Sequence, residues 1–146
     1  MAIRFAHTIE VPQGPAKVFG VLDDFSQTPK WLSRCTGIEQ VTPGNKTAGT
    51  KLRYSYRDGG RSGTMDGEVV SRTPDQQLTM QYGDKMIVVV VDFQLAPNGA
   101  GTKLTHAIEM SPKSFVMKLF APMIRKQVAK QTVTAMESLR SLLASR

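Results

Sequence analysis

Residues 113–144 carry the longest helical pattern in the chain, and this pattern limits what the rest of the chain can form. Apolar side chains recur there at about 100° per residue. They form one drifting stripe that consists of Val116, Phe120, Met123, Ile124, Val128, Ala135, Leu139 and Leu142. A single amphipathic helix cannot bury such a stripe by itself. Pro122 lies inside the pattern and removes a backbone hydrogen bond, so we expect a kink or a break there.

The preceding residues alternate in hydrophobicity and supply a partner for the stripe. Residues 3–11 place Ile3, Phe5, His7, Ile9 and Val11 on one face, which is typical of a half-buried strand. Turn signals rich in Gly, Pro, Asn and Asp separate six more predicted strands. They cover about 37–42, 51–57, 63–72, 77–82, 86–95 and 102–110. Short connections between short strands indicate an antiparallel meander.

Two short helices are predicted between the first and second strands. Pro15 suits the first turn of a helix that covers about 16–23, and Thr28 is placed to cap a second helix that runs through 31–32. An antiparallel sheet of this size has one apolar face to cover. We therefore predict an α+β fold in one domain, residues 1–146, with a curved seven-stranded sheet wrapped around the long C-terminal helix. The short helices close one end.

Several protein classes are excluded by composition. Cys35 is the only cysteine, which excludes an internal disulfide framework and a multi-cysteine zinc site. No apolar run reaches the roughly 18 residues that a membrane span needs. The first ten residues show neither a long apolar stretch nor a cleavage signal. We expect a cytoplasmic protein that holds no metal and no cofactor.

The net charge of +7 is concentrated at one end of the chain. Residues 111–146 hold seven basic side chains and one acid, whereas residues 1–110 hold 12 basic and 11 acidic ones. A nucleic-acid binder often interleaves aromatic and basic residues. Here Phe115 and Phe120 fit the apolar face instead, so we expect no nucleic-acid partner. The basic face predicts weak, salt-sensitive contact with anionic membrane surfaces, and the alternative is an ordinary solvated helix face.

Several short motifs resemble one known superfamily. Thr-Ile-Glu-Val-Pro at 8–12 and Pro-Ala-Lys-Val-Phe at 15–19 resemble the strand-to-helix opening of bacterial START-like, or SRPBCC, proteins. Asp-Asp-Phe at 23–25 with Pro-Lys-Trp at 29–31, and Ser-Leu-Arg-Ser-Leu-Leu at 138–143, resemble two further structural stretches of that family. The resemblance covers nearly the whole chain, and none of its motifs is catalytic.

That resemblance implies a fold and a kind of ligand. The fold is the helix-grip fold of the birch pollen allergen and of polyketide cyclase/dehydrase-type proteins. The implied site is a deep, mostly apolar cavity between helix and sheet. The implied ligand is a lipid, a sterol, a polyketide or another hydrophobic molecule.

His7 and His106 are the only histidines, and both point inward by strand parity. In the helix-grip fold the first and last strands are neighbours, so the two rings are expected close together. Imidazole titrates near neutrality, which makes the pair candidates for proton transfer or for polar anchors in the cavity. The alternative is two buried histidines satisfied by backbone or water. No third ligand for a metal is evident.

Other polar residues fall on the inferred inward surfaces. Tyr54, Tyr56 and Tyr82 would orient a ligand carbonyl or hydroxyl, or else pack as ordinary core residues. Gln127 and Gln131 lie within or beside the helical stripe. Because a buried amide without partners is costly, they favour a ligand-bearing space under the helix. The alternative is that the helix carries both amides to its edge.

The predicted ligand-binding set mixes large apolar groups with a few polar ones, as ligand pockets of roughly 300–1,000 Å³ do. It consists of Phe5, His7, Leu52, Tyr54, Met80, Tyr82, Val89, Val91, Phe93, His106, Phe120, Ile124 and Gln127. The first hypothesis is a binding protein for a hydrophobic small molecule that is lipid, sterol-like, aromatic or polyketide-like. The alternatives are a polyketide cyclase/dehydratase-type enzyme and an interaction protein that docks on anionic surfaces. In the enzyme, His7, His106, Tyr54 and Tyr82 would supply the acid/base groups, and the sequence leaves open whether the protein is catalytic.

The sixth predicted strand raises the question of assembly. If Ile87, Val89, Val91 and Phe93 face inward, then Met86, Val88 and Val90 face outward. An exposed apolar row on a sheet is a contact site or a liability. We therefore expect a homodimer, or cover of this row by a neighbouring segment.

Overall fold

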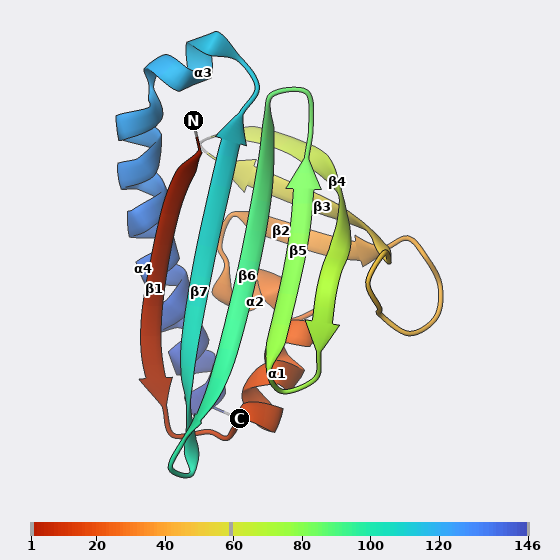
Figure 1. Ribbon diagram of the computed structural model, residues 1–146, viewed down its shortest axis with the longest axis vertical. Coiled ribbons are helices and arrows are strands. Elements are labelled where there is room, and N and C mark those ends of the chain that lie inside the picture. Colours follow the sequence, from red (N-terminus) through yellow and green to blue (C-terminus); the bar gives the residue numbers. More distant parts are fainter. Residues whose placement is uncertain (1, 59, 146) are drawn as a thin grey trace.

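The computed structural model describes residues 2–58 and 60–145 and has the predicted α+β helix-grip architecture (Figure 1). One antiparallel sheet has the strand order β1-β7-β6-β5-β4-β3-β2, so the first and last strands are neighbours. The strands are β1 (Ile3–Val11), β2 (Cys35–Gln40), β3 (Lys51–Asp58), β4 (Arg61–Thr73), β5 (Gln77–Gly83), β6 (Ile87–Asn98) and β7 (Gly101–Pro112). The helices are α1 (Pro15–Asp23), α2 (Thr28–Trp31), α3 (Phe115–Leu119) and α4 (Ala121–Ala144).

The sheet is strongly curved, and two register shifts contribute to its curvature. One lies between Cys35 and Gly37 in β2, and the other between Val69 and Ser71 in β4. An extra residue on one strand bends that strand and increases its local twist. The curved sheet partly encloses α4, and α1 and α2 lie in the lower half of the molecule, with α1 nearer its end and α2 nearer its middle (Figure 1).

The region between α1, α2, the sheet and α4 is filled by a closed apolar core. Phe19 and Leu22 of α1 are buried, and so is Leu139 in the C-terminal half of α4. Trp31 of α2 packs edge-on against Phe93 of β6, with 5.9 Å between ring centroids. These contacts fix the two short helices against both the sheet and α4, so this region of the fold has a dense hydrophobic interior.

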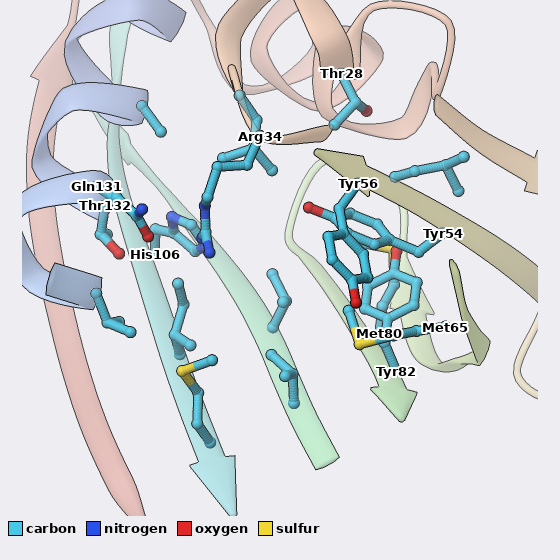
Figure 2. A pocket seen from close by; sticks show the side chains of 18 of the residues that line it. Thr28, Arg34, Tyr54, Tyr56, Met65, Met80, Tyr82, His106, Gln131 and Thr132 are labelled. Carbon is cyan, nitrogen blue, oxygen red and sulfur yellow. The ribbon is translucent and has the colours of Figure 1, made fainter. Parts of the chain in front are cut away.

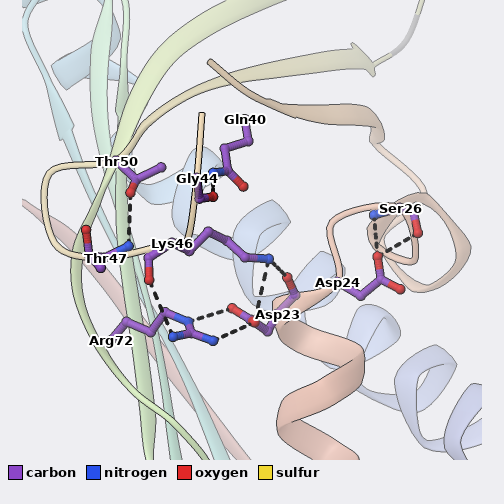
Figure 3. Close-up of polar contacts among 9 residues, drawn as sticks. All are labelled: Asp23, Asp24, Ser26, Gln40, Gly44, Lys46, Thr47, Thr50 and Arg72. Atoms are coloured by element: carbon purple, nitrogen blue, oxygen red, sulfur yellow. Dashed lines mark hydrogen bonds and ion pairs between the residues drawn. The ribbon is translucent and has the colours of Figure 1, made fainter. Parts of the chain in front are cut away.

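A charged cluster ties the end of α1 to the sheet (Figure 3). The guanidinium of Arg72, on β4, donates to both carboxylate oxygens of Asp23 through Nε at 3.0 Å and Nη2 at 2.9 Å. Lys46, in the loop between β2 and β3, donates to the backbone carbonyl of Asp23 and lies 3.6 Å from its carboxylate. Arg72 and Lys46 also stack over the rings of Phe19 and Phe25, respectively. Each charged group in this cluster has a partner within the chain.

The helical pattern at the C-terminus divides into two helices. The break predicted at Pro122 is confirmed, because α3 ends at Leu119 and Pro122 lies in the first turn of α4. No described helix combines the length and the apolar character needed to cross a bilayer.

The predicted apolar stripe is buried only in its C-terminal part. Val128, Ala135 and Leu139 are buried, and Ile124 and Leu142 are half-buried. The predicted burial of Val116, Phe120 and Met123 is wrong, because all three side chains are exposed. The physical reason is that α3 follows directly on β7 and lies at the end of the sheet, beyond the strands that would cover it (Figure 1).

Candidate functional site

A cavity of about 290 Å³ lies between the concave face of the sheet and α4 (Figure 2). Its walls are mostly apolar and include residues of α1, α2, α3, α4 and every strand except β1. The volume is at the lower limit of typical ligand pockets, which hold roughly 300–1,000 Å³. It is also roughly ten times the ~30 Å³ share of one water molecule, so the space is large enough for an organic ligand.

The cavity has a closed end and an open end. Leu22, Trp31 and Phe93 form buried wall at the end that α1 and α2 cover. At the other end the wall includes Asp84, in the turn between β5 and β6, and Met117 of α3, which are only half-buried. The opening therefore lies next to α3.

Part of the predicted ligand-binding set lines this cavity. Its members there are Tyr54, Met80, Tyr82, Val89, Val91, Phe93 and His106. Gln131 of α4, which we placed within or beside the helical stripe, also lies on the wall. Strand alternation located these side chains correctly because β3, β5, β6 and β7 present every second residue to the concave face.

The other predicted residues lie elsewhere. Phe5, His7, Leu52, Phe120, Ile124 and Gln127 are not among the lining residues. Leu52 faces inward as predicted but is buried in the core. The predicted inward orientation of Phe120 and Gln127 is wrong, because both side chains are exposed. Phe5, His7 and Ile124 are half-buried. The reason on β1 is that α4 packs directly against this strand and separates it from the cavity.

The two histidines are adjacent, as the fold implied, but they do not share the cavity. His7 and His106 are direct register partners in the β1–β7 pair. Only His106 lies on the cavity wall. A proton-transfer pair that works on one ligand is therefore not supported by this arrangement.

Three tyrosines form an aromatic end of the cavity (Figure 2). The ring centroids of Tyr54 and Tyr82 are 4.9 Å apart, and those of Tyr54 and Tyr56 are 6.5 Å apart. Gly67 lies opposite Tyr82, and a Cβ atom there would stand 2.3 Å from the Tyr82 ring. Burial raises the pKa of Tyr54 and of Tyr82 above the ordinary value, so both phenols remain protonated.

A polar group of residues lies at a different place on the wall. It consists of Arg34, between α2 and β2, His106 of β7, and Gln131 and Thr132 of α4, with Arg34 extending toward the other three (Figure 2). His106 is 2% exposed and stacks on Phe93 at 4.4 Å between ring centroids. Burial, the largest cause, lowers the pKa of His106 to about 3, so its imidazole is neutral near neutral pH.

These polar atoms have few partners inside the chain. Among the described residues, neither ring nitrogen of His106 accepts or donates a hydrogen bond, and the same holds for Thr132 Oγ1 and Arg34 Nε. Thr132 is 1% exposed. Within residues 2–58 and 60–145, the Arg34 side chain has no ion pair with any carboxylate. Buried polar groups in folded proteins are nearly always hydrogen-bonded, which makes this group of residues unusual.

Two carboxylates lie on the cavity wall, and neither neutralises Arg34. Asp84 accepts hydrogen bonds from the backbone N–H groups of Met86 and Ile87 at 2.7 and 3.0 Å. Asp58 is exposed at the end of β3. The Arg34 guanidinium therefore keeps a positive charge that no carboxylate of the described residues pairs with.

Sequence interpretation missed Arg34, Trp31 and Thr132 as cavity residues. Arg34 and Trp31 belong to the connection between β1 and β2, where no strand or helix period assigns a direction to a side chain. Thr132 had a usable signal, because it lies four residues after Val128 and three before Ala135 on the buried face of α4.

Other chemical groups offer little for catalysis. Among the described residues, no cluster of three or more His, Cys, Asp or Glu side chains could hold a metal ion. Cys35 is buried and does not line the cavity, and burial raises the pKa of its thiol. A reactive thiolate is therefore not favoured at this position.

Comparison with known proteins gives a family and a fold. The sequence model of a family described as "Polyketide cyclase / dehydrase and lipid transport" matches residues 2–144. No curated protein matches the chain.

Solved structures with the same fold include three informative ones. An aromatase/cyclase named Zhui from a Streptomyces species superposes with a TM-score of 0.84 at 12% identity, covering 100% of this chain and 96% of that one. A START superfamily protein from Mycobacterium smegmatis gives 0.82 at 19% identity, with 97% of each chain covered. The protein Ara h 8.0201 gives 0.75 at 18% identity, with 100% of each chain covered.

Proposed function

The chain belongs to the polyketide cyclase/dehydrase and lipid transport family, and from that premise we propose that it binds a hydrophobic small molecule between its sheet and α4. The observation that carries the proposal is the cavity of about 290 Å³ with mostly apolar walls. Protein interiors are close-packed and contain few voids larger than a water molecule. A space of this size in the middle of a small fold is therefore better explained by a ligand than by imperfect packing.

The walls indicate what the ligand looks like. Tyr54, Tyr82 and Met80 offer flat and polarizable apolar surface, which suits an aromatic or polyketide-like body as well as an alkyl chain. The phenol of Tyr82 donates to Met80 Sδ at 3.2 Å, a weak bond that a ligand oxygen would replace favourably.

Filling the cavity tests this proposal. Val91 lies on the wall in β6, so Val91→Trp should occupy the space. The parent protein should bind 1-anilinonaphthalene-8-sulfonate saturably in the micromolar range, with displacement by fatty acids, and the variant should not. Val133→Trp is the matched control, because Val133 lies on α4 away from the wall and is partly exposed. Ile124 is unsuitable for this test because it does not line the cavity.

Either of two results would contradict the ligand-binding proposal. A parent protein that shows no saturable dye binding, or a folded Val91→Trp variant that binds as the parent does, would refute the ligand-binding proposal. Thermal unfolding followed by circular dichroism establishes that each variant is folded.

A cyclase/dehydratase-type enzyme is the second candidate, supported by the aromatase/cyclase of the same fold and by the phenols of Tyr54 and Tyr82. Its acid/base chemistry is harder to support. The neutral His106 is a weak base, the raised phenol pKa values make weak acids, and His7 lies outside the cavity. If the protein is such an enzyme, Tyr54→Phe should abolish ring closure of a poly-β-ketone probe while leaving dye binding intact.

The exposed apolar residues beside the cavity opening support contact with anionic membranes. Phe115 and Leu119 of α3 are 73% and 65% exposed, and residues 111–136 contain basic side chains but no acid. Apolar insertion together with attraction to anionic lipid is the usual basis of such contact. Binding to phosphatidylglycerol vesicles should weaken at high salt and on charge reversal at Lys118, Arg125 and Lys126. Binding that survives both changes contradicts the electrostatic account.

The homodimer expected from the outward row of β6 remains a proposal. Val88 and Val90 are half-buried on the outer face, and Met86 is exposed at the start of the row. A dimer through this face would cover all three side chains. Light scattering that gives a monomer mass at high protein concentration contradicts it. The cytoplasmic setting expected from the sequence also remains a prediction.

A further inference from the structure

We propose that Arg34, His106 and Thr132 bind the carboxylate of the hydrophobic ligand, so that the ligand is an amphipathic acid with an alkyl or aryl body. The inference rests on the proposed function and adds the chemical class of the ligand. It is carried by the cluster of buried polar atoms on the cavity wall that have no partner among the described residues.

Arg34 is the charged member of this group of residues. Its side chain is half-buried, and a partly desolvated charge is unfavourable when it has no partner. Its Nε is buried without a partner, and no carboxylate of the described residues pairs with it. A guanidinium presents a planar fork of donors that matches the two oxygens of a carboxylate. A ligand carboxylate would therefore supply the partner that the chain lacks.

His106 and Thr132 complete the site with neutral groups. A neutral imidazole keeps one N–H donor, and a threonine hydroxyl can donate as well. Both side chains are almost fully buried and lie on the wall next to the end of Arg34 (Figure 2). Together the three side chains can satisfy both oxygens of one carboxylate.

The charge count favours a carboxylate over a more highly charged group. Arg34 is the only lysine or arginine among the cavity-lining residues that the structure describes, and Asp58 and Asp84 already bring two carboxylates to other parts of the wall. One cation balances one negative charge, whereas a phosphate monoester would bring close to two. The small, mostly apolar cavity also has little capacity to solvate additional charge.

The position of the site orients the ligand. The polar residues lie at one side of the cavity, and Tyr54, Tyr56 and Tyr82 lie across the space from them (Figure 2). A carboxylate on Arg34 therefore directs the apolar body of the ligand toward the tyrosines. Such an arrangement selects acids over neutral molecules of the same length and shape.

A matched pair of probes tests the inference. Decanoate and decanol have the same chain length and differ in the head group, and isothermal titration calorimetry gives the affinity of the full-length protein for each. Wild type should bind decanoate more tightly than decanol. Arg34→Gln should weaken decanoate binding roughly 10- to 100-fold, or about 1.4–2.8 kcal/mol, as expected for the loss of one charge-assisted hydrogen bond, and should change decanol binding less than about threefold.

Two further variants keep the test interpretable. Arg57→Gln is the control, because Arg57 is exposed on the neighbouring strand and does not line the cavity. Thr132→Val keeps the shape of the side chain while removing its unpartnered hydroxyl, so it should fold and weaken decanoate binding about 3- to 10-fold.

The outcomes separate the two proposals. If wild type binds neither probe, the ligand-binding proposal itself is refuted. If wild type binds both probes equally and Arg34→Gln changes neither, the ligand-binding proposal stands and the carboxylate site is overturned. An equal loss of both probes in Arg34→Gln also overturns it, because a head-group contact would act on decanoate alone.

Discussion

Arg72 and Arg34 both carry a guanidinium group partly into the protein, at two sites that differ in how completely the chain supplies partners. Arg72 meets both carboxylate oxygens of Asp23 and stacks over Phe19 (Figure 3). Arg34 meets no carboxylate of the described residues and points into the cavity (Figure 2). The first site is complete within the protein, whereas the second is complete only with something bound.

That difference separates stability from binding. Arg72 and Asp23 hold α1 against the sheet, and removal of Asp23 would leave Arg72 without its carboxylate partner. Removal of Arg72 would leave Asp23 with only Lys46 close to its carboxylate, 3.6 Å away. An arginine without a partner contributes little to the stability of the fold. Its replacement by an apolar residue removes a charge that is partly desolvated and unpaired. We therefore expect substitution of Arg72 to lower the stability of the fold, and substitution of Arg34 to lower the affinity for the ligand.

The largest effect should come from Arg72→Met. This change removes the bidentate partner of the half-buried Asp23 and leaves only Lys46 near its carboxylate, at 3.6 Å. We expect the free energy of unfolding to fall by about 2–3 kcal/mol, less than the cost at a fully buried pair because both side chains retain some exposure. Chemical denaturation measures it. Arg53→Met, which breaks the exposed pair with Glu39, should cost less than about 1 kcal/mol, and equal losses would contradict the account.

The next largest effect is the loss of stability at acidic pH that the buried His106 should cause. Burial first, then Arg34 and His7, lower its pKa, and Asp92 raises it, with a net value of about 3 against 6.5 in the unfolded chain. Between these values the unfolded state binds a proton that the folded state does not. Stability should therefore fall as the pH drops, by about 1.4 kcal/mol per pH unit from this group.

His106→Gln isolates that contribution from the titrating carboxylates. The free energy of unfolding of wild type minus that of the variant should decrease as the pH is lowered from 6 to 4. Denaturation curves at several pH values measure the difference. Parallel pH profiles would mean that the ring is hydrated in the folded protein, which would weaken the picture of a dry polar site.

Arg34→Met should change the free energy of unfolding less than Arg72→Met does. We expect the free energy of unfolding to remain within about 1 kcal/mol of wild type or to rise, because an unpaired charge gives way to an apolar side chain on an apolar wall. The same variant should lose the preference for decanoate over decanol. A loss of stability as large as that of Arg72→Met would show that Arg34 has a partner within the folded chain.

The smallest effect should come from Asp58→Asn. Asp58 lies on the cavity wall and is exposed, so its charge weakly opposes an incoming carboxylate. Decanoate binding should strengthen about two- to threefold at low salt, and decanol binding should not change. Weaker decanoate binding would show that Asp58 organises the site instead of opposing it.

The sequence predicted the sheet well because strand parity is a strong signal. The alternation of residues 3–11 and of β3, β5, β6 and β7 gave both the strands and the inward positions of Tyr54, Tyr82 and His106. The helical period gave α4 but overestimated its buried length. Periodicity records which face is apolar, and it cannot record where the sheet beneath that face ends.

The polar end of the cavity was less predictable. Arg34 reaches it from an irregular connection, where backbone direction depends on how α2 packs on the core. The absence of a partner for a side chain is a property of the assembled structure, because every potential partner has to be placed before it can be excluded. The contrast between Arg72 and Arg34 therefore required coordinates.

A crystal structure of the complex with decanoate would show where the carboxylate binds. We expect the carboxylate within ion-pair distance of the Arg34 guanidinium and in contact with Thr132, with the alkyl chain directed toward Tyr54 and Tyr82. A complex in which the carboxylate lies at the opening beside α3, with the methyl end next to Arg34, would contradict it.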